Sequence, residues 1–97
     1  MKREEFLFTI GYEGGTALVD GNSMRQYKKA TAMELAQKGL YKPALCAALF
    51  DGNTGDVPQI LQMYNENSGS TYATIEDLKR LFGVYEVPQN INKVMII

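Results

Sequence analysis

The hydrophobic pattern of the chain begins with an alternation over residues 6–12. Every second position there holds a large apolar or aromatic side chain, the spacing that places side chains on one face of a β-strand: Phe6, Phe8, Ile10 and Tyr12. The glycines that follow, in Glu13-Gly14-Gly15, supply the backbone freedom of a tight turn. We therefore predict a strand over 6–12 and an antiparallel returning strand from Thr16 to Val19.

The next stretch has two interpretations. Asp20-Gly21 is a second hairpin signal, which makes Met24–Tyr27 a candidate third strand of a meander. The alternative is a helix that begins after Ser23, because neither glycine nor proline interrupts residues 24–38. We prefer the strand because a better helix start lies downstream.

Two helices are expected in the middle of the chain. Thr31 and Glu34 have the spacing of a capping box, which predicts a helix that begins there and stops at Gly39. Pro43 suits the first turn of a second helix. The run from Ala44 to Phe50 is apolar on nearly every side of that helix, so we predict that it lies centrally in the fold.

The second half of the chain predicts two more helices and a strand. One helix opens at Pro58 and ends near Glu66, with a loop over 65–71 behind it. The other opens at Thr74 and stops at Gly83. The tail Lys93–Ile97 is too apolar to hang free and is expected to complete the N-terminal sheet.

These elements predict a single α+β domain over residues 1–97. It combines an N-terminal antiparallel hairpin or meander and a C-terminal strand in one small sheet with three or four short helices on one face. A chain of 97 residues is too short for a second core. The side chains expected in the core are Phe6, Phe8, Ile10, Val19, Leu35, Leu45, Leu49, Phe50, Ile60, Leu61, Leu78, Phe82, Val94 and Ile96.

The composition excludes several kinds of site. The chain has no histidine and one cysteine, so it has no imidazole base, no histidine-dependent triad, no intrachain disulfide and no cysteine cluster for a metal. The loop from Asp51 to Asp56 is similar to the start of an EF-hand loop, but Asp56 stands where the sharp turn needs glycine. Cys46 lies in an apolar run and is expected to be buried and unreactive. We expect no catalytic residue, cofactor or metal.

Charge is distributed unevenly although the formal net charge is only -1. The segment from 25 to 42 is basic and the segment from 51 to 77 is acidic, which gives each a capacity to steer a partner. The candidate binding surface consists of the basic side chains Arg25, Lys28, Lys29, Lys38 and Lys42. The expected partner is an unidentified protein or a second copy of the chain in a homodimer, rather than nucleic acid or a membrane.

Residues 31–50 resemble a repressor-type DNA-binding helix-turn-helix, with Gly39 as the turn glycine. The resemblance implies a nucleic-acid-binding regulator whose second helix enters the major groove. Leu35 departs from the expected alanine, and the outward positions of the second helix lack donors for base edges. A helix-turn-helix regulator is therefore the alternative to our main hypothesis.

The main hypothesis is a small cytoplasmic, non-enzymatic binding or regulatory module. Export signals and apolar runs of membrane-spanning length are absent from the sequence. Nucleophile–base pairs and metal-ligand clusters are absent as well. A small enzyme that uses Asp, Glu, Tyr or Lys chemistry is the third option.

Overall fold

The computed structural model describes all 97 residues and is built around α4 (Tyr41–Asp51). Five consecutive residues of this helix, Ala44 to Ala48, are buried. Successive residues of an α-helix point about 100° apart, so five of them face every direction around the axis. Other elements must therefore cover α4 on all sides, as the apolar sequence of this helix predicts.

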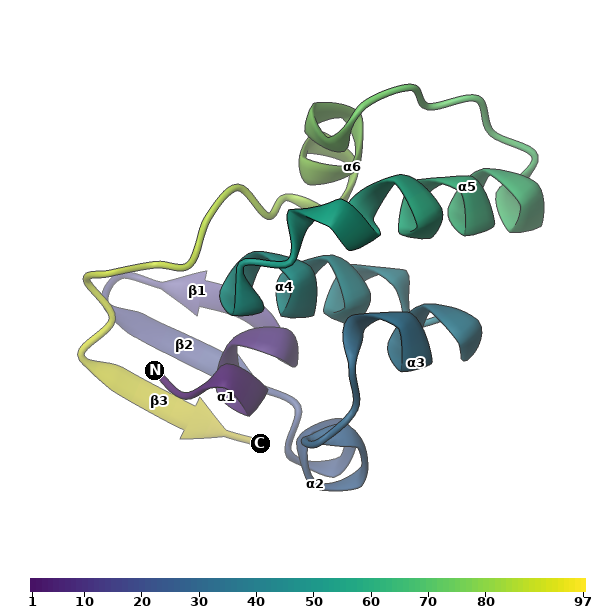
Figure 1. Cartoon of the computed structure of the whole chain (residues 1–97). Coiled ribbons are helices and arrows are strands. Elements are labelled where there is room, and N and C mark those ends of the chain that lie inside the picture. Colours follow the sequence, from purple (N-terminus) through teal and green to yellow (C-terminus); the bar gives the residue numbers. More distant parts are fainter.

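Five further helices and a short 3-10 turn accompany α4 (Figure 1). Their bounds are α1 (Arg3–Leu7), α2 (Gly21–Tyr27), α3 (Ala32–Gln37), the 3-10 turn (Thr54–Asp56), α5 (Val57–Ser68) and α6 (Ile75–Phe82). The helices α1, α3 and α5 contact α4 directly, and α6 contacts α5. None of the helices is both long enough and apolar enough to cross a membrane.

One small sheet brings the two ends of the chain together. Its strands are β1 (Thr9–Glu13), β2 (Thr16–Val19) and β3 (Lys93–Ile96), in the order β1-β2-β3. β2 pairs antiparallel with β1 and parallel with β3, so it is the central strand. The predicted α+β class, the N-terminal hairpin and the C-terminal strand are confirmed, with six helices instead of three or four.

The first predicted strand is wrong over its N-terminal half, because residues 3–7 form α1. Glu4 and Glu5 lie in its first turn, where acidic side chains stabilise a helix, and Glu5 Oε1 accepts a hydrogen bond from the Lys2 backbone at 2.6 Å. The three residues Phe6, Leu7 and Phe8 are all buried. The alternation of a strand with one buried face would have exposed Leu7, the middle residue.

The preferred strand over Met24–Tyr27 is also wrong, because α2 occupies this segment. The Asp20 side chain caps the helix by accepting hydrogen bonds from the backbone of Asn22 at 3.1 Å and of Ser23 at 3.3 Å. Asp20-Gly21 is therefore a helix start and not a hairpin turn. The helix that we weighed against the strand is present, and it begins two residues before Ser23.

The predicted helix signals in the rest of the chain are confirmed. Thr31 and Glu34 form the expected reciprocal capping box, with N–H···O distances of 3.1 and 3.0 Å. Gly83 ends α6 in the left-handed conformation, as predicted. α5 extends to Ser68, two residues beyond the expected end, so the predicted 65–71 loop is shorter.

Three side chains expected in the core are exposed: Ile10, Phe50 and Ile96. Ile10 lies at an irregularity in the pairing of β1 with β2, which shifts the strand out of simple alternation. Phe50 is near the end of α4, and its ring packs against Phe6 at 6.2 Å between centroids. Ile96 is on β3, an edge strand with no fourth strand beside it, and it stays 49% exposed although Gly21 of α2 packs against it.

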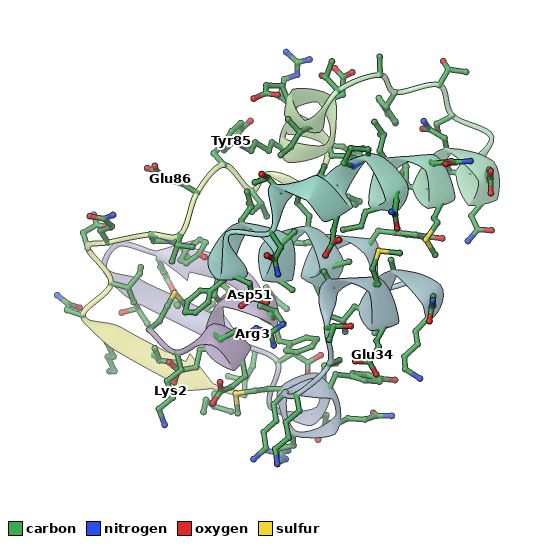
Figure 2. All side chains as sticks on the ribbon, in the orientation of Figure 1. Lys2, Arg3, Glu34, Asp51, Tyr85 and Glu86 are labelled. Atoms are coloured by element: carbon green, nitrogen blue, oxygen red, sulfur yellow. The ribbon has the colours of Figure 1, made fainter.

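Arg3 links three parts of the helical layer (Figure 2). Its guanidinium donates to the Asp51 carboxylate, with Nε 2.9 Å from Oδ1 and Nη2 3.1 Å from Oδ2. It also donates to the backbone carbonyls of Ala30 at 2.9 Å and Lys28 at 3.3 Å. One side chain thus ties α1 to the end of α4 and to the connection between α2 and α3.

Replacing Arg3 by methionine should lower the free energy of unfolding by about 2 kcal/mol, because it removes a bidentate ion pair and leaves two carbonyls without their donor. Both partners are mainly shielded, with side-chain exposures of 22% for Arg3 and 32% for Asp51. The measurement is urea unfolding followed by circular dichroism. As a matched control, Arg80→Met breaks the ion pair with Asp77, but Arg80 is 67% exposed. For Arg80→Met we expect the free energy of unfolding to fall by less than about 0.5 kcal/mol. Equal losses in the two variants would contradict the stabilising role of Arg3.

The strand β3 is held at both ends by backbone hydrogen bonds. Gly15 O accepts from Asn92 N at 2.9 Å at one end, and Ile97 O accepts from Gly21 N at 3.1 Å at the other. A methyl group at Gly21 would lie 2.7 Å from Ile96 Cγ2 and 3.2 Å from Ile97 O. Close packing of α2 against the end of β3 therefore leaves no space for a side chain at residue 21.

The substitution Gly21→Ala should destabilise the protein by about 1–3 kcal/mol, because the added methyl group overpacks the contact between α2 and β3. Gly11→Ala is the matched control, since nothing lies within 4 Å of the place that its methyl group would take. Thermal unfolding of the two variants should separate them. If Gly21→Ala melts no lower than Gly11→Ala, the tight contact is not present in solution.

Candidate functional site: a groove beside β1

Two of the five basic residues singled out by the sequence, Lys28 and Lys42, lie near opposite ends of α4. Lys28 follows α2, and its backbone lies beside Arg3 at the Asp51 end of α4. Lys42 is in the first turn of α4, nine residues from Asp51, which is about 14 Å along a helix. The five basic residues also differ in exposure. Only Lys42 is partly buried, and the other four are exposed: Arg25, Lys28, Lys29 and Lys38.

Lys42 lines two hollows that adjoin each other beside β1. The first hollow, of about 200 Å³, lies between β1, α4 and the end of α6; it is lined by Phe6, Thr9, Ile10, Gly11, Tyr12, Lys42, Cys46, Gly83 and Val84. The second, of about 170 Å³, lies toward α2; it is lined by Leu7, Phe8, Thr9, Ile10, Asp20, Ser23, Leu40, Lys42 and Pro43. Because they share Thr9, Ile10 and Lys42, the two hollows meet at the lysine.

A third hollow extends the row in the opposite direction. It has a volume of about 280 Å³ and shares Phe6, Tyr12, Gly83 and Val84 with the first hollow. Its outer wall is the chain that follows α6, from Tyr85 to Asn90. We call the three hollows together the β1 groove.

The β1 groove follows a strand edge that no other strand covers. In Figure 1 the chain that follows α6 passes beyond β1, on the side away from β2. Glu13 and Thr16 flank the two-residue turn at Gly14-Gly15, so their backbones form a hydrogen-bonded pair. The next pair, Tyr12 and Ala17, is then a pair without hydrogen bonds between its two backbones. The backbone N–H and C=O of Tyr12 therefore point away from β2, and no loop or turn bonds to them.

The charge on Lys42 has no counterpart within the protein. The two ion pairs of the structure are Arg3–Asp51 and Arg80–Asp77, and the Lys42 side chain makes no hydrogen bond. Leu40, the residue before α4, offers no side-chain acceptor to the first turn of the helix. Lys42 therefore brings an unpaired positive charge to the junction of the first two hollows.

Asp20 lines the second hollow but is already engaged in capping α2. Its carboxylate accepts from the Ser23 hydroxyl at 2.9 Å as well as from the backbone of Asn22 and Ser23. The Ser23 hydroxyl is the main cause that lowers the pKa of Asp20. The carboxylate is thus engaged in its own helix cap, and it remains ionised.

The remaining polar groups of the first hollow are neutral at physiological pH. Burial raises the pKa of Tyr12, although a hydrogen bond with Thr9 acts in the opposite direction. Burial also raises the pKa of Cys46 to about 12, against the smaller influence of the Lys42 ammonium. The Thr9 hydroxyl donates to the backbone carbonyl of Glu5 at 2.6 Å. Lys42 is consequently the one charged group of the first hollow.

The groove offers binding chemistry and not an evident reaction. Cys46 is held as a thiol and therefore lacks the thiolate character of a nucleophile. No cluster of three or more carboxylates or thiols is placed to hold a metal ion. Comparison with models of protein families, with curated protein sequences and with solved structures gives no match for this chain.

Sequence reasoning named Lys42 but missed the groove around it. Ile10 was expected in the core and Tyr12 on the same face of a strand, whereas both line the groove and are exposed. Glycine at 83 was interpreted only as a helix stop, although it also lines the first and third hollows. The signal that could have been used is the aromatic and β-branched composition of β1 next to the start of the most apolar helix.

Cys46 should react with a thiol reagent at pH 8 at least about 100-fold more slowly in the native protein than in denaturant, because it is buried and its pKa is far above 8. Labelling kinetics with and without urea measure this ratio.

The raised pKa of Cys46 also makes the stability of the protein depend on pH. The contribution of the buried thiol is fully present below the pKa of the unfolded thiol and is lost as pH rises from about 9 to 12. Cys46→Ala should flatten that decline in stability. Equal labelling rates in the native and the denatured protein would contradict the burial of the thiol.

Proposed function

We propose that the protein is a non-enzymatic binding module that holds an extended segment of a partner protein in the β1 groove. The observation that carries this proposal is the continuous row of three hollows along an uncovered strand edge. In strand addition, backbone hydrogen bonds to an edge provide affinity and pockets for alternate side chains provide specificity. The β1 groove supplies both elements.

The size of the hollows supports a peptide over a compact small molecule. Each hollow has a volume of about 170–280 Å³. Pockets for drug-sized ligands are larger, at roughly 300–1,000 Å³, and enclose most of the ligand. Hollows of the smaller size suit single side chains, and their arrangement along β1 suits side chains presented by one extended backbone.

The helix-turn-helix alternative gains no support from the arrangement of α4. Its would-be recognition helix is the most buried helix of the fold, and the basic residues Lys28 and Lys42 lie near opposite ends of it. No observation favours the small enzyme either. The cytoplasmic location and the homodimer stay predictions.

The proposal can be tested with Tyr12, whose backbone N–H faces the open edge. Peptides are first selected from a random ten-residue phage library against the immobilised protein, and their binding sites are then mapped by amide chemical shifts. We expect the shifts to centre on residues 9–13. Tyr12→Pro should weaken binding at least tenfold, because proline removes this N–H without breaking a bond to β2.

The matched control is Tyr12→Ala, which removes the same ring but keeps the N–H. We expect it to bind several-fold more tightly than Tyr12→Pro. Circular dichroism and melting temperature show whether both variants remain folded. Selected peptides that shift residues far from β1, or equal affinities of the two variants, would refute strand addition in the groove.

A further inference from the structure

We propose that the segment bound in the β1 groove carries an acidic side chain, which Lys42 receives where the first and second hollows meet. This inference rests on the proposed function and adds the chemistry of the occupant. It starts from the position of Lys42, which is the one residue of the basic set that lines the groove and the one that is partly buried.

An unpaired ammonium in a confined site favours an incoming carboxylate. Lys42 has no ion-pair partner, so no internal contact has to break when an acid binds. About half of the residues that line the two hollows are hydrophobic, with Phe6, Leu7 and Leu40 among them. Hydrogen bonds between charged groups are roughly twice as strong as neutral ones, and they strengthen further where water is excluded.

The other charges of the groove restrict where the acid can sit. Asp20, in the second hollow, is held by three hydrogen bonds within its own helix cap. Glu86 lines the third hollow and makes no ion pair. An acidic side chain would therefore be repelled by Asp20 in the second hollow and by Glu86 in the third, and attracted by Lys42 between them, which gives the bound strand a defined register.

The neutral neighbours of Lys42 suit a carboxylate as well. The hydroxyl of Tyr12 stays protonated at physiological pH, because burial raises its pKa, and so it remains a hydrogen-bond donor. Residues two positions before and after the acid project to the same side of the bound strand, about 7 Å away. They would enter the neighbouring parts of the groove, where Phe6 and Val84 provide apolar walls.

The experiment uses three nonapeptides of alternating threonine and valine, acetylated and amidated so that their ends carry no charge. The central residue is glutamate, glutamine or lysine. Affinities for the full chain are measured by amide chemical-shift titration. We expect the glutamate peptide to bind at least tenfold more tightly than the glutamine peptide, with both shifting residues 9–13.

Variants at Lys42 test whether this residue is the cause of the preference. Lys42→Met keeps an aliphatic side chain and should bind the glutamate and glutamine peptides equally. Lys42→Glu should reverse the preference, so that the lysine peptide binds most tightly. Lys38→Glu changes an exposed charge outside the three hollows and should leave the preference for glutamate unchanged.

The outcomes separate this inference from the proposed function. If the glutamate and glutamine peptides bind equally to the native protein and both shift residues 9–13, the acidic occupant is refuted and strand addition stands. If none of the three peptides shifts β1, both are refuted. If the β1 shifts depend on protein concentration without peptide, the groove takes a second copy of the chain, and the partner segment is refuted.

Discussion

The fold depends on the need to bury α4 on every side. A helix with one apolar stripe can rest on a single surface, but the run from Ala44 to Ala48 points in all directions around the axis and is buried throughout. The small sheet cannot supply that cover alone, and α1, α3 and α5 pack directly against the helix. Small side chains at three of these five positions let the neighbouring elements approach closely. The short helices, which would be marginal in isolation, thus become stable through packing on a common centre.

The charged side chains at the two ends of α4 differ in how they are paired within the protein. At the C-terminal end, Asp51 is held by Arg3, which also binds two backbone carbonyls. The charges of Arg3 and Asp51 thus pair with each other inside the protein. At the N-terminal end, Lys42 is partly buried yet unpaired.

Local sequence signals predicted the elements whose ends are determined by local chemistry. The capping box at Thr31 and the glycine stop at 83 satisfy the backbone of their own helices, so they are recognisable in the sequence and present in the structure. Asp20-Gly21 failed as a signal because the same dipeptide serves a hairpin or a helix cap, and the approach of α2 to β3 decides between them. The phenylalanines at 6 and 8 were ambiguous for the same reason. Both belong to the core, but packing on helices and not strand periodicity explains them, because Phe6 packs against Phe50 of α4 and Phe8 against Tyr27 of α2.

The groove as a whole was not predicted, because it is formed by segments that are distant in the sequence and meet only in the folded protein. Its position also explains why β1 and not β3 is the edge proposed to bind. Both are edge strands, and β3 exposes apolar side chains at Met95 and Ile96. None of the residues from 93 to 97 lines a hollow, so a strand added to β3 would find backbone partners but no pockets for its side chains. Beside β1 the same backbone chemistry is joined by three hollows and one unpaired charge, and selectivity for one sequence over another requires such features.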